Sequence, residues 1–568
     1  MALLGAAFQI GRSALAAYQA GVTISGQNIA NAGNADFTRL NGRLRAEVGG
    51  PVLGGVRPGA GVRLAALQRN IDEAVEARLR TSLATRKGAE TRYSAMNQIE
   101  SLFNELSDVD LTSQLGTLFA NFASLQTSPT DMSARNIVLS GARGAVDEFR
   151  RLRRGLLDQV SNLNDTIELN ARRVSDVAGE VAQLNQQIVN EESSSGQISS
   201  PLRDRRDGLL RELAEFVDIT VRHQETGSVN VYIGSEPFVE FDRSRGLAAE
   251  TRIEDGLEIV DVRFADDRTR VNVSDGLLAG VLNTRDTIKD EQLARLDQLA
   301  NGLIYEVNRV HATGHGLIGQ TATTGANAVR DPGVPLNATD NLNFPVQNGT
   351  FIVNVRDRAS GTIITRQIEV DLDGIGGDDT TLADLAGALD GVPGLDATVT
   401  PDNRLSVTAS PEQEFWFSED SSGALAALGM NAFFQGSDAG SIDIASNVAA
   451  DPRLIAAARG PEAADGDNAG SIAGLGELAS QLLGGLSANE FHGETVGRLA
   501  VAAGAALTTH EAADTIYQSL IAQRESVSGV SLDEEAINLM KFEKAFQGAT
   551  RYIGVLDQLA NEMLSIVR

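Results

Sequence analysis

The chain has 568 residues, no cysteine, and a formal charge of −28 from 76 acidic and 48 basic side chains. Its acidic balance argues against binding to nucleic acid or to an anionic membrane surface, and the lack of cysteine excludes disulfides, thiol nucleophiles and thiolate metal sites. At this length we expect about three or four domains, and a hydrophobic content of 42% is enough to build their cores.

No stretch of the sequence is apolar for long enough to span a bilayer. The N-terminal segment also lacks the layout of a cleaved secretory signal, because Arg12 interrupts its apolar part and no cleavage site follows. If the protein is exported, we expect a route that leaves its N-terminus in place.

The first predicted element is an amphipathic helix from about Ala2 to Ala30, ending near Gly33. Its apolar and small residues follow one another at alternating intervals of four and three, which is the pattern that a coiled-coil partner buries. This stripe consists of Leu4, Phe8, Gly11, Leu15, Tyr18, Val22, Ser25 and Ile29.

The central part of the chain changes period several times. Residues 33–65, rich in glycine and proline, are predicted to be loop and extended chain. Helical periodicity covers residues 71–106, 111–125, 138–188, 200–216, 274–311 and 469–521. Alternating apolar residues predict short strands over 217–264 and again within 325–445, where a capping box from Thr381 to Asp384 marks a short helix.

The last predicted element is a helix capped by Ser531, with acidic residues in its first turn. It repeats the alternation of the first helix through Leu539, Phe542, Phe546, Ala549, Ile553, Leu556, Ala560, Met563 and Val567. Two such stripes at opposite ends predict that the ends pair with each other, with copies of themselves, or with both.

The predicted fold is therefore mostly α with β-rich insertions, an α+β multidomain chain whose terminal helices pair as a coiled coil. We divide it into a terminal coiled-coil domain, a helical rod, a small β domain and an outer α+β insertion. The coiled-coil domain comprises residues 1–40 and 530–568, and the helical rod comprises residues 41–216, 274–324 and 446–529. The small β domain is residues 217–273, and the outer insertion is residues 325–445.

The sequence contains no convincing catalytic or metal-binding constellation. His311 and His315 are four residues apart, but Gly314 lies between them and the glutamate of a zinc protease motif is absent. The acidic stretch from Asp371 to Asp379 lacks the ligand spacing of a calcium loop and is predicted to be a solvated turn. We predict that the protein is not an enzyme and needs no cofactor or metal.

Two segments resemble the signatures of the bacterial flagellar rod, hook and hook-associated proteins. Ser25-Gly26-Gln27-Asn28-Ile29-Ala30-Asn31 followed by Phe37-Thr38-Arg39 resembles the N-terminal signature, although a different turn replaces the usual Gly-Tyr pair. Ser528-Gly529-Val530-Ser531-Leu532-Asp533-Glu534-Glu535 resembles the C-terminal one. Within this family, Gly276 to Gly280, Arg285-Asp286, and Asn308 with His311 and Gly314 are most similar to the members that join hook and filament.

The resemblance implies an extracellular structural subunit of the flagellum that forms a ring between hook and filament, with its terminal helices in the inner tube. It implies export through the flagellar type III pathway and four kinds of partner: copies of itself, the hook protein, a second hook-associated protein on the filament side, and a cytoplasmic export chaperone at the C-terminal helix. The expected assembly interface comprises Leu4, Phe8, Leu15, Tyr18, Val22, Asn28, Ile29, Asn31, Leu539, Phe542, Phe546, Ile553, Leu556 and Met563.

Two alternatives remain. One is a hook or distal rod protein of the same family, although the long helix and total length count against it. The other is a secreted adhesin or hydrolase that uses the 325–445 insertion, where Trp416 with Phe415 and Phe417 forms an aromatic cluster. Packing between strands explains that cluster more simply.

Overall fold

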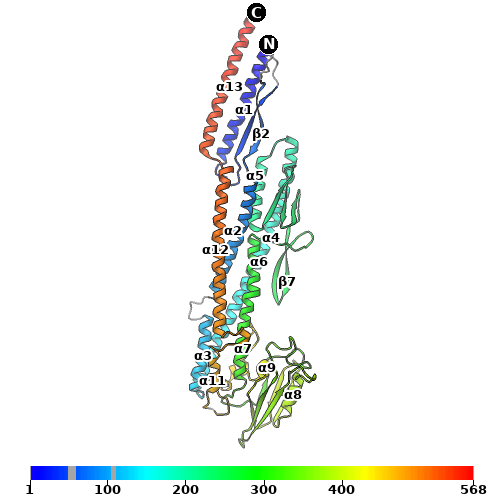
Figure 1. Cartoon of the computed structure of the whole chain (residues 1–568), viewed down its shortest axis with the longest axis vertical. Helices are drawn as coiled ribbons and strands as arrows, with labels where there is room; N and C mark the ends of the chain where they lie inside the picture. The colour runs from blue at the N-terminus through cyan, green and yellow to red at the C-terminus, as the bar shows by residue number, and fades with distance from the viewer. Residues whose placement is uncertain (1, 49–58, 104–109, 463, 567–568) are drawn as a thin grey trace. The chain divides into compact units, whose positions relative to one another are not determined.

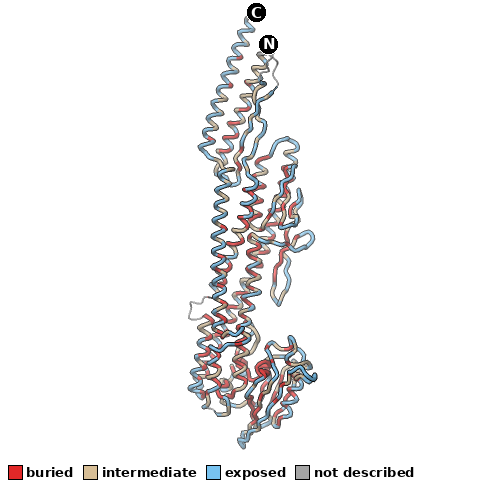
Figure 2. Tube along the Cα trace, viewed as in Figure 1, coloured by how far each residue is buried: buried red, intermediate tan, exposed pale blue. Residues whose placement is uncertain are grey.

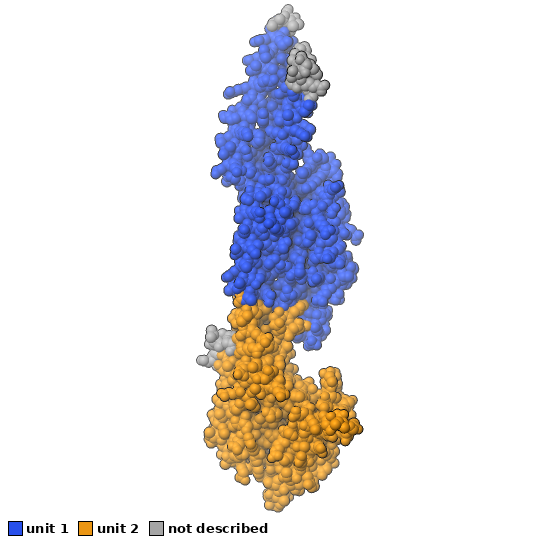
Figure 3. Space-filling view, in the orientation of Figure 1, with its two compact units in different colours: residues 1–95, 163–284, 505–568 blue, residues 96–162, 285–504 orange. Residues whose placement is uncertain are grey.

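The computed structural model describes residues 2–48, 59–103, 110–462 and 464–566 (Figure 1). The chain forms two compact units, each assembled from segments distant in sequence (Figure 3). Unit 1 comprises residues 1–95, 163–284 and 505–568, and unit 2 comprises residues 96–162 and 285–504. Helices α2, α4, α6 and α12 contribute residues to both. The predicted mixture of long helices and β insertions is confirmed.

In unit 1 the two ends of the chain lie side by side, with a β-hairpin beside them (Figure 1). These elements are α1 (Ala2–Ala30), β1 (Leu40–Glu47), β2 (Gly61–Arg69) and α13 (Leu532–Ile566). Within the expected loop and extended chain over 33–65, the extended parts pair as this hairpin, and residues 49–58 lie outside the described residues. The hairpin strands pair antiparallel, and contact with α1 stabilises a strand pair that the many glycines made hard to predict.

Helices also form much of the core of unit 1. They are α2 (Glu73–Phe103), α4 (Met132–Ser195), α5 (Ser200–Phe216), α6 (Leu277–Thr287) and α12 (Ala488–Ser528). The alternating apolar residues of α4 in this unit, such as Val174, Val181 and Ile188, are fully or almost fully buried. A Cβ atom on Gly280 of α6 would lie 2.7 Å from the carbonyl oxygen of Gly88, so glycine permits this close helix approach.

The predicted strands after residue 217 form two small sheets in unit 1. The first has the order β3 to β6 and the second pairs β7 with β8. The strands are β3 (Ile219–His223), β4 (Val229–Ile233), β5 (Glu236–Glu240), β6 (Arg243–Ser244), β7 (Leu247–Glu254) and β8 (Leu257–Phe264). Polar side chains of α4 hold both sheets: Asn185 Nδ2 donates to the carbonyl of Val229, and Asn164 Nδ2 donates to that of Glu258.

Unit 2 has an aromatic core between helices and a mixed α+β region. Its helices α3 (Leu111–Thr127), α7 (Ala294–His311) and α11 (Asp467–Gly474) accompany parts of α2, α4 and α12. The rings of Phe122 and Phe433 meet edge to face, 5.2 Å apart. The predicted continuous helix over 274–311 is interrupted by a π-helical segment, Ile288–Leu293. The backbone hydrogen bonds of a π-helix span one residue more than those of an α-helix.

The α+β region of unit 2 contains two three-stranded sheets, with orders β11-β10-β14 and β12-β13-β9. The strands are β9 (Ala322–Thr324), β10 (Gly349–Asp357), β11 (Ile363–Val370), β12 (Leu395–Val399), β13 (Leu405–Ala409) and β14 (Gln413–Ser418). The capping box of α8 (Leu382–Asp390) is present as predicted. Trp416 and its two phenylalanine neighbours in β14 are all buried, so this cluster is core packing.

The shorter elements of unit 2 connect these parts. They are α9 (Ala424–Leu428), β15 (Phe434–Gln435), β16 (Asp443–Ile444), α10 (Ser446–Ala450), and the 3₁₀ segments Pro452–Leu454 and Gln481–Leu483. None of the helices in the described residues combines the length and apolarity that crossing a membrane requires.

Candidate functional site

The candidate site is the pair of terminal helices, which run antiparallel (Figure 1). The direction follows from their contacts, because Gly11 of α1 meets Ile553 of α13 and Gly21 meets Phe542. A Cβ atom on Gly21 would lie 2.7 Å from the phenylalanine ring, and one on Gly11 would lie 2.6 Å from Ile553 Cγ1. Large apolar side chains of α13 therefore rest directly on the backbone of α1 at two glycines.

The buried face of α1 coincides only in part with the residues that we expected: Gly11 and Ser25 belong to the predicted stripe, and Asn28 belongs to the expected assembly interface. The buried face consists of Gly11, Ala17, Gly21, Ile24, Ser25 and Asn28. The expected residues Leu4, Phe8, Leu15, Tyr18, Val22 and Ile29 lie mainly one residue position round the helix, about 100° away, and are only half-buried in the single chain. The recurring small residues of α1 were the sequence signal for the buried face.

On α13 the expected stripe faces α1 along most of its length. Leu556 is buried, and Leu539, Phe542, Phe546 and Ile553 are half-buried. Met563 is 48% exposed and belongs instead to a second apolar stripe, which is largely exposed in the single chain and meets α1 only at its Tyr552 edge, beside Gly11. That outer stripe consists of Tyr552, Val555, Leu559 and Met563. Figure 2 shows the largely exposed surface of α13.

The two terminal signatures meet where α1 ends and α13 begins. Asn28 binds the start of the hairpin in both directions, since its Nδ2 donates to the carbonyl of Leu40 and its Oδ1 accepts from the Leu40 amide, each at 2.9 Å. Asn31, directly after α1, is half-buried and donates to the carbonyl of Gln27 in the last turn of the helix. The asparagines thus determine how the chain leaves the helix.

Arg39 joins the N-terminal signature to the C-terminal one. Its guanidinium contacts Glu534 at 2.8 Å and Glu535 at 2.6 Å in the first turn of α13, and its amide donates to the carbonyl of Ser528. Burial alone would lower the pKa of Arg39, but the hydrogen bonds and charges of the two glutamates raise it above its ordinary value. The sequence showed each signature but not this contact, which spans almost the whole chain.

The histidines of the sequence analysis have structural partners in unit 2. His311 is fully buried; its Nδ1 lies 2.7 Å from the carbonyl oxygen of Asn431, and its Nε2 accepts a hydrogen bond from the amide of Ala456 at 2.9 Å. Because Nε2 accepts, the ring is neutral and Nδ1 carries the proton. Burial lowers the pKa of His311 to about 4. Both ring nitrogens are occupied by backbone groups.

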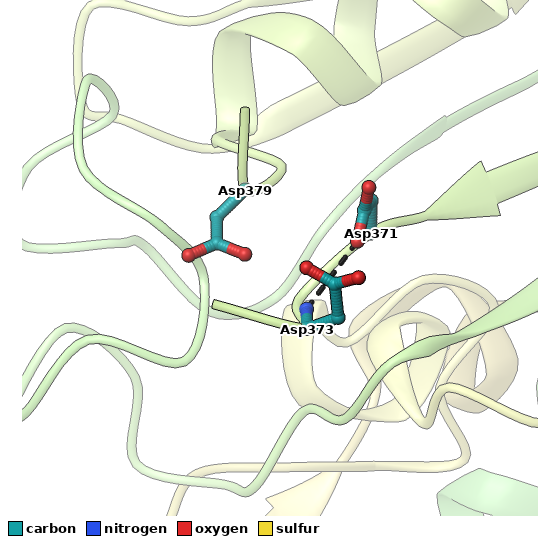
Figure 4. A group of neighbouring side chains, drawn as sticks. All are labelled: Asp371, Asp373 and Asp379. Carbon is teal, nitrogen blue, oxygen red and sulfur yellow. Dashed lines mark hydrogen bonds between the residues drawn. The ribbon is translucent and has the colours of Figure 1, made fainter. Parts of the chain in front are cut away.

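In the described part of the chain, one group of acidic residues is compact enough to suggest a cation site (Figure 4). Oxygens of Asp371, Asp373 and Asp379 lie within 4.8 Å of one another. All three come from the single turn that we predicted, and they accept hydrogen bonds from its own amides, including that of Gly374 at 2.9 Å from Asp379 Oδ1. Backbone amides therefore stabilise these charges within the turn.

Three comparisons show which known proteins the chain is similar to. Residues 96–326 match the family described as "Flagellar hook-associated protein FlgK helical domain". Over 578 aligned residues the chain is 25% identical to flagellar hook-associated protein 1 of Salmonella typhimurium, covering 98% of both proteins. The identity is 24% to the Escherichia coli protein of that name and 23% to the Bacillus subtilis one, again over nearly the full length.

The chain is similar to flagellar hook-associated protein 1 over nearly its whole length. A solved structure, "The structure of the flagellar hook junction protein FlgK from Burkholderia pseudomallei", superposes with a TM-score of 0.53 at 14% identity, covering 80% of this chain and 100% of that one. This similarity supports a common fold. The similarity to hook-associated protein 1 sequences includes both terminal signatures, since it extends over 98% of the chain.

Proposed function

We propose that this chain is a structural subunit of the bacterial flagellum that forms the junction between hook and filament. The observation that carries the proposal is the nearly full-length similarity to hook-associated protein 1 from three different bacteria. Its location is the extracellular flagellum, and its role is structural rather than catalytic. A hook or rod protein is a less good match, because the named relatives are all hook-associated proteins.

Assembly proceeds through the terminal helices. The half-buried stripe of α1 and the outer stripe of α13 remain available to neighbouring copies after the two helices have paired. Completely burying a large aliphatic side chain contributes about 1.5–3 kcal/mol. Several such residues on each helix, repeated around a ring, offset the entropy lost on association. The terminal domain, residues 1–40 and 530–568, is then the inner tube, and the remaining domains of the sequence-based division lie outside it.

The exposed stripe of α13 also suggests which individual partners the chain has. Before assembly the outer stripe of α13 needs protection from water and from premature association, which suits a cytoplasmic export chaperone that holds the C-terminal helix. Export through the flagellar type III pathway would not require a cleaved signal. In the finished structure the axial neighbours are the hook protein and a second hook-associated protein. The adhesin or hydrolase alternative loses support because Trp416 and its aromatic neighbours are buried.

Substituting the outer stripe should abolish assembly without weakening the fold. We expect the double variant Val555→Ser/Leu559→Ser to keep its thermal midpoint within about 2 °C, because both residues are exposed in the single chain. A strain that lacks the gene and expresses this variant should form hooks without attached filaments under the electron microscope. The matched control Gln558→Ser, on an exposed polar position of the same helix, should restore filaments. Normal filaments with the double variant would contradict the proposal.

Deleting either terminal helix should separate folding from assembly. Removal of residues 1–30 or 535–568 should leave a soluble monomer, because unit 2 contains no residue of either segment and the core of unit 1 includes α2, α4 and α5. Circular dichroism and gel filtration would measure folding, and electron microscopy of the complemented strain would score filament attachment. Collapse of the remaining domains in both deletions would show that the ends are part of the core instead.

A further inference from the structure

Ion pairs connect the segments next to the terminal helices of unit 1, the loop after α1 and the end of the hairpin, to its long helices. We propose that these pairs form an electrostatic clamp, centred on Glu76, that fixes the direction of the α1–α13 pair relative to α2, α5 and α12. We call this group of residues the joint; it comprises Asp36, Arg39, Arg69, Glu76, Asp204, Asp207, Arg211, Arg524, Glu534 and Glu535. The inference concerns a single chain and does not depend on what the chain assembles with.

The centre of the joint is Glu76 in the first turn of α2. Its side chain is only 3% exposed, and each carboxylate oxygen binds one arginine: Oε2 contacts Arg211 Nη1 of α5 at 3.1 Å, and Oε1 contacts Arg524 Nε of α12 at 2.8 Å. One buried carboxylate thus joins three helices. Both arginines are themselves largely buried, so water competes little for these contacts.

Both arginines also reach the loop that follows α1. Arg211 Nη2 contacts Asp36 at 2.7 Å, and Arg524 Nη1 donates to the carbonyl of Ala35 at 3.0 Å. Gly208 of α5 permits this approach, since a Cβ atom there would lie 3.1 Å from the Asp36 carboxylate. Glu76 therefore positions two guanidinium groups that hold the exit of α1.

A further arginine, Arg69, binds the end of the hairpin to α5. Arg69, at the end of β2, has a side chain only 6% exposed and lies between Asp204 and Asp207 of α5, with its Nη2 at 2.7 Å from Asp204 Oδ1. Asp204 also accepts from the amide of Thr38 at 3.4 Å. Burial alone would lower the pKa of Arg69, but the charges of the two aspartates raise it.

The third passage, before α13, is held by contacts with the end of α12: the Arg39 amide donates to the carbonyl of Ser528 at 3.0 Å, and Asn70 Nδ2 donates to the carbonyl of Val527 at 2.6 Å. The Arg39 ion pair with Glu534 and Glu535 fixes the first turn of α13 beside this contact. The chain passes between the terminal elements (α1, the hairpin and α13) and the long helices after α1, after β2 and before α13. Each of these three places is thus bound. Guanidinium groups that bind two partners in a plane restrict orientation as well as distance, unlike apolar packing, which tolerates sliding. The joint accordingly restricts the direction of the α1–α13 pair relative to α2, α5 and α12.

Spin labels can test this directly because the chain has no cysteine of its own. Cysteines at the exposed positions Ala77 of α2 and Gln547 of α13 would carry the labels. Double electron–electron resonance on the full chain should give one narrow distance distribution. Glu76→Gln should broaden it by about twofold or more, because both arginines lose the buried carboxylate that positions them and Arg211 keeps only its pair with Asp36. Arg172→Gln, which breaks an exposed pair with Glu168 on α4, is the matched control and should leave the distribution unchanged.

Lysine variants decide the question if Glu76→Gln fails to fold by circular dichroism. Arg211→Lys and Arg524→Lys keep the charge but cannot bind two partners in a fixed plane, so each should broaden the distribution by less than Glu76→Gln. An unchanged distribution in Glu76→Gln, or in both lysine variants, would overturn the proposal. Broadening in the Arg172→Gln control would also overturn it, because the effect would not be specific to the joint.

Discussion

Replacing Gly21 with leucine should separate α1 from α13 and prevent assembly. A Cβ atom at this position would lie 2.7 Å from Cγ and Cδ1 of Phe542, and the base of an aromatic ring cannot move without moving its helix. Leucine favours a helix over glycine by about 0.8 kcal/mol, whereas overpacking costs about 1–3 kcal/mol and the helices also lose the packing of the ring. We expect the clash to dominate by about 2 kcal/mol.

Hydrogen exchange of the amides in α1 measures this effect. A loss of about 2 kcal/mol corresponds to roughly 30-fold faster exchange across the helix. Gly26→Ala is the matched control, because no atom lies within 4 Å of its Cβ position and alanine is the better helix former. The control should exchange at the same rate or more slowly. Equal protection in Gly21→Leu and the unmodified chain would show that the two helices do not need close contact at this glycine.

The terminal helices show which parts of such a structure a sequence reveals. Their spacing predicted both elements and their pairing, because a stripe of apolar residues must be covered. The face of α1 that α13 covers was predicted only in part, since Gly21, which lies against Phe542, was outside the stripe and contributes little apolar surface of its own. A glycine at a helix contact stabilises it by leaving room for a side chain of the partner helix. Here that side chain is 521 or more residues away in the sequence.

The joint was beyond sequence analysis for a different reason. The chain has 76 acidic and 48 basic residues, so periodicity alone cannot tell which pairs meet. Glu76 appears as an ordinary residue of the first turn of α2, where negative charge is favoured in any case. Only the folded positions of Arg211 and Arg524 distinguish it from the many solvated glutamates. The β-hairpin was likewise hidden by glycines and by its dependence on α1.

Asn308, His311 and Gly314 entered through the family resemblance, and the structure gives each a physical role. Asn308 Oδ1 accepts from the amides of Phe433 and Phe434, and a Cβ atom on Gly314 would lie 2.1 Å from Asn468 Nδ2. Asn431 donates to the carbonyl of His311 at 3.2 Å. These contacts attach the end of α7 to the segments around 431–434 and 456–468. His311, which does not readily accept a proton, therefore lies where three segments of unit 2 meet.

Acid should therefore destabilise unit 2 through His311. Its pKa is about 4 in the folded protein, mainly because of burial, against an ordinary value of 6.5, so the unfolded chain binds the proton first as the pH falls. The contribution to stability is complete above pH 6.5 and declines between 6.5 and about 4, by at most 1.4 kcal/mol per pH unit and about 3 kcal/mol in total. A protonated ring would also place an Nε2 donor against the Ala456 amide, which is itself a donor.

Denaturant unfolding followed by tryptophan fluorescence can measure this decline, because Trp416 is the only tryptophan of the chain and lies in unit 2. The variant His311→Gln should be less stable at pH 7.5, yet lose about 3 kcal/mol less than the unmodified chain between pH 6.5 and 4. Carboxylates that titrate in this range affect both proteins equally and cancel in the difference. His223→Gln, in unit 1, should retain the full decline in this signal. If His311→Gln and the unmodified chain lose stability in parallel, then protonation of this buried ring does not cause the acid sensitivity of unit 2.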